Sequence, residues 1–278
     1  MSRGVPHAEV IGNPIAQSKS PAIHRFWLER LGLEGDYAAQ QVDGDGLAHF
    51  FAARRGDTHW RGCNVTIPHK QAVLALCDRI DETARSIGAV NTVWRAQDGA
   101  LAGTNTDIEG VREAIAKADP SGHAVVLGAG GAARAAFAAL AAGGWSGTRI
   151  LARSAGKARA AADASRLDAS VVPFEPGSGA FANASLVVNA TQLGMQGQEA
   201  LPAFVLQELA RASANAVVFD MVYAPLETRL LAAARALGLQ PVDGLTMLIG
   251  QAARAFELFF GHPAPRECDA DLRALLTS

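Results

Sequence analysis

A glycine-rich turn lies in the middle of the chain, between an apolar stretch and an alanine-rich stretch. Residues 124–127 are apolar, and Gly128, Gly130 and Ala133 follow with the spacing G-x-G-x-x-G/A. Without a Cβ, the backbone can turn sharply and approach a phosphate closely, and the N-terminus of a following helix offers free N–H groups to it. The pattern predicts a strand, a turn and a helix to about residue 142 that hold a dinucleotide. A plain strand-to-helix turn is the alternative.

A pair of basic residues follows the next predicted strand. Residues 149–152 lead into Arg153 and Ser154, and Lys157 comes one helical turn later. An NAD-binding fold usually has an acidic residue here for the ribose 2′-hydroxyl, whereas a guanidinium pairs with a 2′-phosphate. A cation at a helix N-terminus is unfavourable unless an anion lies nearby. We therefore predict NADP as the cofactor; a solvated basic helix start is the alternative.

Two serines precede the first predicted helix, which spans residues 22–31. Ser20 is followed by Pro21, which predicts an N-cap with proline in the first helical position. Ser18 would lie just outside this helix. Two hydroxyls beside free helix N–H groups can bind an anion, and ordinary capping explains the same residues.

Three further polar residues could serve a ligand or only the fold. Lys70 opens a predicted helix over 70–77, where a cation is unfavourable unless it serves a site, although it could be a surface lysine. Asp107 opens the helix predicted over 107–118, which also suits an ordinary cap. Gln251, in the apolar helix that begins at Gly244, either points into a cleft or is a hydrogen-bonded interior side chain.

Composition favours a packed globular protein with one large domain or two smaller ones. The 278 residues are 49% hydrophobic and 19% charged, and the formal net charge of −2 predicts no nucleic-acid or membrane partner. Three irregularly spaced cysteines predict no disulfide framework, and no metal-ligand cluster stands out. Without a signal core or an apolar run of about 18 residues, we expect a cytoplasmic protein.

Strands alternate with helices along the chain, which predicts a mostly parallel α/β sheet covered on both faces. Ligands bind such sheets outside the carboxyl ends of the strands, where Asn189, Thr191, Met221 and Tyr223 lie. Pro241 predicts an edge position for the last strand. The predicted strands are residues 9–12, 35–42, 64–67, a segment within 86–94, 124–127, 149–152, 170–173, 186–189, 216–220 and 240–242, and further helices are 46–55, 157–167, 226–237 and 244–260.

Several ordered motifs together resemble the shikimate dehydrogenase family over nearly the whole chain. They are Gly12-Asn13-Pro14-Ile15, Ser18-Lys19-Ser20-Pro21, Asn64-Val65-Thr66-Ile67-Pro68-His69-Lys70, Gly88-Ala89-Val90-Asn91-Thr92, Asn105-Thr106-Asp107, Gly128-Ala129-Gly130-Gly131-Ala132-Ala133, Asn189-Ala190-Thr191 with Gly194-Met195, and Gly244-Leu245-Thr246-Met247-Leu248 with Gln251.

The resemblance implies a two-domain α/β fold. Residues 1–105 and 245–278 would form the catalytic, substrate-binding domain, and residues 106–244 an inserted Rossmann domain, with the active site in the cleft between them. The implied reaction is the reversible NADPH-dependent reduction of 3-dehydroshikimate to shikimate in aromatic amino-acid biosynthesis. The ligands would be small molecules, and the protein a monomer or homodimer.

The resemblance also implies roles for individual residues. Ser18, Ser20 and Thr66 would hold the substrate carboxylate, with Tyr223 nearby. Asn91, Asp107 and Gln251 would bind ring hydroxyls, and Lys70 and Asp107 would form the catalytic pair. The predicted NADP contacts are Gly128, Ala129, Gly130, Gly131, Ala132, Arg153, Ser154, Lys157, Thr191, Met221 and Gly244.

Some positions depart from the family pattern, and two other functions are open. Ala152 stands where the family often has asparagine, Gln192 replaces a common serine, and Ile108 replaces the glycine that usually follows the aspartate. These departures bear on cofactor affinity rather than on the reaction. The alternatives are a quinate or mixed quinate/shikimate dehydrogenase, whose relatives commonly have threonine as the second residue of the serine pair, and a non-catalytic NADP-sensing protein, against which the intact catalytic pair counts.

Overall fold

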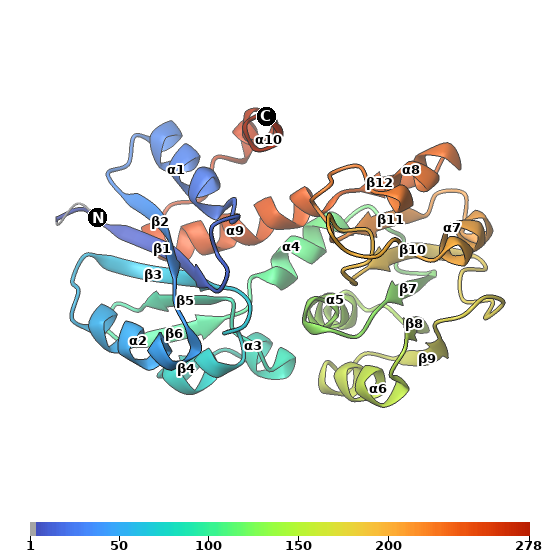
Figure 1. Cartoon of the computed structure of the whole chain (residues 1–278), viewed down its shortest axis with the longest axis horizontal. Helices are drawn as coiled ribbons and strands as arrows, with labels where there is room; N and C mark the ends of the chain where they lie inside the picture. Colours follow the sequence, from blue (N-terminus) through green and yellow to red (C-terminus); the bar gives the residue numbers. More distant parts are fainter. Residues whose placement is uncertain (1–3) are drawn as a thin grey trace. The chain divides into compact units, whose positions relative to one another are not determined.

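The computed structural model describes residues 4–278, and these form two compact units. Unit 1 contains the residues up to Thr106 together with Gln251–Ser278, and unit 2 contains Asp107–Gly250. The boundaries predicted from the sequence were 105/106 and 244/245, whereas those of the structure are 106/107 and 250/251. Each unit is built on one six-stranded sheet (Figure 1). No helix of the described residues is long and apolar enough to span a membrane.

The sheet of unit 1 is mixed, which corrects the expectation of a mostly parallel sheet for this half of the chain. β1 pairs in parallel with β2 and β3, whereas β5 is antiparallel to β3 and β6. A tight turn with Gly99 at φ +86° joins β5 to β6, and strands joined so closely can only pair antiparallel. The order is β2-β1-β3-β5-β6-β4, for β1 His7–Gly12, β2 Asp36–Gln41, β3 Trp60–Val65, β4 Arg79–Ile80, β5 Thr92–Arg95 and β6 Leu101–Thr104.

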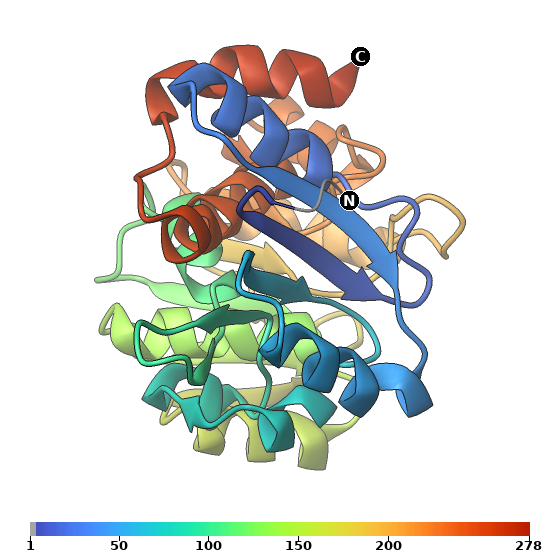
Figure 2. The ribbon, with the colours of Figure 1, turned by 90° about the vertical axis from the view of Figure 1, so that its left-hand side faces the viewer.

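Apolar cores cover both faces of this sheet. Figures 1 and 2 show α1 and α10 on one side of the strands and α2 on the other. Val10 and Tyr37 pack with Phe259 of α9 in one core, and Ile11 lies with Phe51 of α2 in the other. The helical segments of this unit are α1 Ser20–Leu31, η1 Gly44–Gly46, α2 Leu47–Arg55, η2 Ala72–Leu76, α3 Glu82–Ile87, η4 Arg266–Cys268 and α10 Asp269–Thr277; α9, Gly244–Phe260, contains the boundary between the units.

The sheet of unit 2 is entirely parallel and has the strand order of a dinucleotide-binding fold. The order is β12-β11-β10-β7-β8-β9, with β12 at an edge as Pro241 predicted. The strands are β7 His123–Leu127, β8 Thr148–Ala152, β9 Ala169–Pro173, β10 Ala184–Asn189, β11 Val217–Asp220 and β12 Gln240–Val242. The helices are α4 Asp107–Ala114, α5 Gly131–Ala142, α6 Ala155–Ala164, α7 Ala203–Glu208, η3 Leu209–Arg211 and α8 Arg229–Ala236. Helices α7 and α8 pack on the face of the sheet that carries Val125 and Val187.

The local structure around Lys70 differs from the prediction. The strand expected over 64–67 ends at Val65, and the helix expected over 70–77 is replaced by turns and the short η2. The Lys70 carbonyl accepts from the Val90 N–H at 2.8 Å, so it is committed to a tertiary contact and not to a helical one. Lys70 therefore does not occupy a first helical turn, contrary to the prediction.

The start of α1 also differs. The N-cap is Lys19, so Ser20 is already helical and does not cap the helix with its side chain. The Ser18 hydroxyl instead accepts from the Ser20 N–H at 3.3 Å. Ser18, which was expected to lie outside the helix, thus accepts from the first N–H of the helix, and the expected cap by Ser20 is wrong.

Candidate functional site

The glycine turn of unit 2 is shaped to accept a phosphate group. Gly128 has φ +100°, and a Cβ there would lie 2.8 Å from the Thr191 Cγ2, so a side chain would be strained and crowded. Gly130 precedes α5 as its N-cap without any side-chain cap. A Cβ on Gly130 or Gly131 would meet no atom within 4 Å, so the backbone N–H groups of this helix start are approachable. The predicted strand, turn and helix are all present.

The strands at this turn form the switch point of the sheet. β7 lies between β10 and β8, and the chain reaches β10 only after building β8 and β9 on the other side. Ligands of such sheets bind at the carboxyl ends on either side of this crossover. Gly128 follows β7, and Thr191 follows β10, so the structure brings these two predicted residues together.

The basic residues after β8 are exposed and available to an anion. Arg153, Ser154 and Lys157 are all solvent-exposed, and Ser154 is the N-cap of α6 without a side-chain cap. Neither basic side chain forms an ion pair or a hydrogen bond with any residue in the described range 4–278. Two unpaired cations at a helix N-terminus favour an incoming phosphate.

A buried carboxylate that the sequence analysis passed over joins the loops after β10 and β11. Asp220 is fully buried, and its side chain accepts from the Asn189 Nδ2 at 2.9 Å, the Val222 N–H at 3.1 Å and the Thr228 Oγ1 at 2.7 Å. Burial raises the pKa of Asp220. Asn189 in turn accepts from the Thr191 hydroxyl at 2.7 Å. An aspartate that ends an apolar strand, with a threonine eight residues later, is the sequence signal for this network.

Three other predicted residues of unit 2 lie on these loops or next to them. Met221 is half-buried, and Tyr223 is 37% exposed. Gly244 is buried, and a Cβ there would lie 2.5 Å from the Met221 carbonyl oxygen. Close packing therefore requires glycine at 244.

In unit 1, the segments that follow β1 and β3 and the segment that precedes β5 meet at one edge of the sheet. β1 and β3 end at this edge, and because β5 runs the opposite way, it begins there. A Cβ on Gly12 would lie only 2.5 Å from the Thr66 Cγ2, so the loop after β1 packs directly on the loop after β3. The Lys70 carbonyl accepts from Val90, which ties Lys70 to the segment that carries Asn91. Thr66 and Lys70 are both half-buried.

Asn91 and Gln251 are linked through Thr106 at this edge. The Thr106 N–H donates to the Asn91 Oδ1 at 2.7 Å, and the Thr106 Oγ1 lies 3.4 Å from the Gln251 Oε1. Asn91 and Gln251 are buried, at 3% and 7% exposure. Asp107 follows Thr106 directly as the first residue of α4 and is half-buried.

The serine pair lies on the loop after β1, next to a buried tyrosine. Ser18 is half-buried, and Ser20 is buried. Burial raises the pKa of the neighbouring Tyr37 hydroxyl, and the Ser20 side chain partly counters this rise. Between the serines, the Lys19 Nζ donates to the Leu276 carbonyl at 2.6 Å in the last turn of α10, so this lysine has a structural partner.

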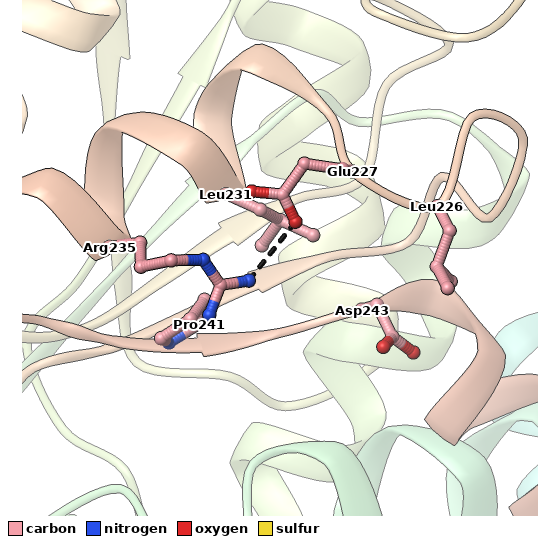
Figure 3. Close-up of a pocket in the computed structure, with 6 residues that line it drawn as sticks. All are labelled: Leu226, Glu227, Leu231, Arg235, Pro241 and Asp243. Carbon is pink, nitrogen blue, oxygen red and sulfur yellow. Dashed lines mark hydrogen bonds and ion pairs between the residues drawn. The ribbon is translucent and has the colours of Figure 1, made fainter.

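A separate pocket of about 200 Å³ lies on unit 2 and includes none of the predicted site residues. In Figure 3 the Arg235 guanidinium points towards Glu227 across it, and their ion pair measures 3.0 Å. Both charges are solvent-exposed, so the pair contributes little to stability. The lining residues are Leu226, Glu227, Leu231, Arg235, Pro241 and Asp243.

Comparison with known proteins relates the whole chain to one family. Residues 10–93 match the shikimate dehydrogenase substrate-binding domain, and residues 244–270 match the shikimate 5′-dehydrogenase C-terminal domain. The NADP(+) shikimate dehydrogenase of Sphingopyxis alaskensis is 51% identical over 274 residues, covering 98% of this chain and 97% of that protein.

Solved structures agree in fold. Shikimate 5-dehydrogenase from Thermus thermophilus, crystallised with NADP(H) and shikimate, is 38% identical with a TM-score of 0.84, covering 97% of this chain and 99% of that one. Quinate dehydrogenase from Corynebacterium glutamicum, crystallised with NAD, is 32% identical with a TM-score of 0.88, covering 98% and 99%.

Proposed function

The chain belongs to the shikimate dehydrogenase family, and from this membership we propose that unit 1 binds the substrate and unit 2 binds NADP. The protein is an NADP-dependent oxidoreductase that interconverts 3-dehydroshikimate and shikimate. The structural observation that supports the cofactor half most strongly is the open start of α5 beside Gly130 and Gly131, with the unpaired Arg153 and Lys157 after β8.

The residues of unit 2 fit the parts of a dinucleotide. The N–H groups at the start of α5 would hold the pyrophosphate, with Ala129 and Ala132 beside the glycines. Arg153, with Ser154 and Lys157, would hold the 2′-phosphate. Thr191, Met221 and Gly244 would line the nicotinamide end. When bound, NADPH supplies the hydride for carbonyl reduction.

The residues of unit 1 supply position and proton chemistry in this proposal. Ser18, Ser20 and Thr66 offer three hydroxyl donors for the substrate carboxylate, and Tyr223 of unit 2 would contribute a fourth. A ketone that accepts a hydride develops negative charge on its oxygen. The Lys70 ammonium would stabilise this charge and donate a proton to the oxygen.

The remaining polar residues would bind the ring hydroxyls. Asn91 and Gln251 would hydrogen-bond two of them, and the Asp107 carboxylate would accept from the hydroxyl next to the reacting carbon. Because the carboxylate can only accept when ionised, it selects a hydroxyl over an ether or ketone at that place.

We further propose that the protein acts as a monomer or homodimer in the cytoplasm. The three cysteines are free, as is usual in a reducing compartment. Neither proposal affects the assignment of the site, because every residue assigned above lies within one chain.

The function is tested by a steady-state assay that follows NADPH absorbance. Shikimate and quinate are each offered with NADP and with NAD. We expect the highest kcat/KM for shikimate with NADP. Binding of NADP without turnover of either acid would indicate a sensor on the same fold and would contradict the enzyme assignment.

Selectivity for NADP is predicted to depend on Arg153. Arg153→Ala removes a charge-assisted contact worth about 1.5–3 kcal/mol, so KM for NADP should rise by about 10- to 100-fold while KM for NAD stays nearly constant. Arg229→Ala, which removes an exposed positive charge elsewhere on unit 2, is the control and should change neither constant. Equal losses with both cofactors in Arg153→Ala would contradict the 2′-phosphate assignment.

Shikimate is predicted to be preferred over quinate. Quinate carries an extra hydroxyl on the carbon that bears the carboxylate, and a buried polar mismatch costs about 1–3 kcal/mol, or about 5- to 150-fold in kcat/KM. Ser20→Thr, which introduces the residue common in quinate-using relatives, should narrow this ratio. An unchanged ratio in the variant would show that position 20 does not set the selectivity.

A further inference from the structure

A network of hydrogen-bonded, buried side chains leads to Asn91 of the proposed substrate site in unit 1. The Tyr37 hydroxyl donates to the Asn64 Oδ1 at 2.6 Å, and the Asn64 Nδ2 donates to the Thr92 Oγ1 at 3.0 Å. The Thr92 hydroxyl then donates to the Asn91 Oδ1 at 2.9 Å. All four residues are at least nine-tenths buried. Of these four residues, only Asn91 is proposed to contact the substrate.

Backbone groups fix the orientation of the two asparagine amides in this network. The Asn64 Nδ2 also approaches the Asn91 carbonyl at 3.4 Å, and since a carbonyl can only accept, the amide nitrogen of Asn64 must face this side. The Thr92 hydroxyl therefore accepts a hydrogen bond from Asn64, and its own proton can be donated to the Asn91 Oδ1 at 2.9 Å, with the Thr106 Oγ1 also 3.1 Å away. At the far end, the Thr106 N–H can only donate, and it also points at the Asn91 Oδ1, at 2.7 Å.

These two donors leave Asn91 with one orientation. If the amide were flipped, its NH₂ group would face the Thr106 N–H, donor against donor, and the Thr92 hydroxyl would lose Asn91 as an acceptor. The Asn91 oxygen is thus turned towards Thr92 and Thr106. The group that Asn91 can present to a ligand is its Nδ2, which is a donor.

We propose that Thr92 is a positioning residue for the substrate, because its hydroxyl helps to hold the Asn91 amide with Oδ1 towards Thr92 and Thr106 and with Nδ2 as the atom that would donate to a ring hydroxyl oxygen. This proposal rests on the proposed function, in which Asn91 binds shikimate. It adds that Asn91 selects a substrate group that can accept a hydrogen bond. It also adds that Thr92, which has no assigned contact with the ligand, enforces this selection. Held in advance, the amide loses no rotational freedom when the substrate binds.

The test compares Thr92→Val with Thr92→Ser in the full-length protein. Valine has nearly the same shape as threonine but no hydroxyl, so Asn91 loses the donor on this side and the Asn64 Nδ2 loses its acceptor. We expect KM for shikimate to rise about tenfold in Thr92→Val, with kcat changed by less than about threefold and KM for NADP unchanged. Thr92→Ser keeps the hydroxyl and should restore KM for shikimate.

Thr148→Val is the matched control. Thr148 is a fully buried threonine of unit 2 whose hydroxyl has no hydrogen-bond partner among the described residues, so its loss should leave KM for shikimate as in the wild type. A wild-type KM for shikimate in Thr92→Val, or a KM in Thr92→Ser as high as in Thr92→Val, would overturn the proposal. A parallel rise in both Michaelis constants would indicate general loss of structure and would also overturn it.

Asn91→Asp tests the same orientation even if Thr92→Val does not fold. An aspartate can accept the bonds from Thr92 and Thr106, but it presents an oxygen where the asparagine presents a donor. We expect KM for shikimate to rise more than tenfold while KM for NADP stays unchanged. A wild-type KM in this variant would overturn the orientation. Failure of the wild-type protein to turn over shikimate would instead overturn the proposed function.

Discussion

Replacing Lys70 with alanine is expected to lower kcat by about 10²–10⁴-fold, the usual contribution of a positioned acid–base group. The ammonium group is proposed to stabilise charge on the substrate oxygen and to donate its proton there. The residue is half-buried in a turn, so its loss should lower the melting temperature by a few degrees at most. Turnover from stopped-flow or steady-state NADPH absorbance, beside a melting curve, measures both.

Asp107→Ala is expected to reduce kcat over the same range. The double variant should lose much less than the product of the single effects, because residues that act on one proton transfer are not additive. Lys117→Ala, an exposed lysine of unit 2, should keep full turnover as the control for loss of a positive charge. Full turnover in either single variant would remove that residue from the proposed catalytic pair, and inactivity with unfolding would favour a structural role.

The second large effect concerns His24 and the stability of the protein in acid. His24 is fully buried and stacks on Tyr37 with ring centroids 4.0 Å apart, and neither ring nitrogen has a hydrogen-bond partner within residues 4–278. Burial lowers the pKa of His24 from 6.5 to about 3. The folded protein therefore holds this ring neutral at a pH where the unfolded chain binds a proton.

The sign of the pH dependence follows. A histidine whose pKa is lowered by folding makes its full contribution to the free energy of unfolding above pH 6.5. This contribution is lost as the pH falls from 6.5 towards 3, because only the unfolded chain binds the proton. Between pH 7.5 and pH 5 the wild-type protein should lose about 2 kcal/mol of unfolding free energy through this group, at about 1.36 kcal/mol per pH unit.

His24→Phe and His24→Leu isolate this effect. Each variant also changes packing, but this cost is the same at both pH values and cancels in the difference. Urea unfolding at pH 7.5 and pH 5 should therefore show about 2 kcal/mol less acid destabilisation in both variants than in the wild type. An equal pH dependence in all three proteins would mean that His24 is not kept neutral by folding.

Sequence patterns predicted unit 2 well, because its structure is determined by local signals. The apolar strands, the Gly128 turn and the edge position of β12 follow from residue types within a few positions. In unit 1, by contrast, the short helix α3 was missed although it has a local signal: the Asp81 side chain accepts from the Ala84 N–H at 2.8 Å, and Gly88 ends the helix with φ +69°.

Unit 1 was predicted less well, because long-range contacts decide its local structure. The Lys70 carbonyl bonds to Val90, which replaces the helix that the sequence favours at that place. Only the fold shows that Asn91, Thr106 and Gln251 share hydrogen bonds, since Gln251 is far away in the sequence. The hydrogen bonds between Tyr37, Asn64 and Thr92 likewise depend on which strands pair with one another. The alternation of apolar and polar residues along each strand does not determine this pairing.

The division of unit 1 between the two ends of the chain determines when this unit can be completed during synthesis. Ala255 and Phe259 pack with Val10 and Tyr37, so one core of the N-terminal sheet lacks part of its cover until the last helices have left the ribosome. Unit 2 is continuous in sequence, and all its strands emerge before those helices. Since domains fold as units when their residues are available, the central unit is expected to fold first, although it is translated second. Until the last helices have been made, the aromatic side chains of Tyr37 and His24 are expected to remain accessible to chaperones and proteases.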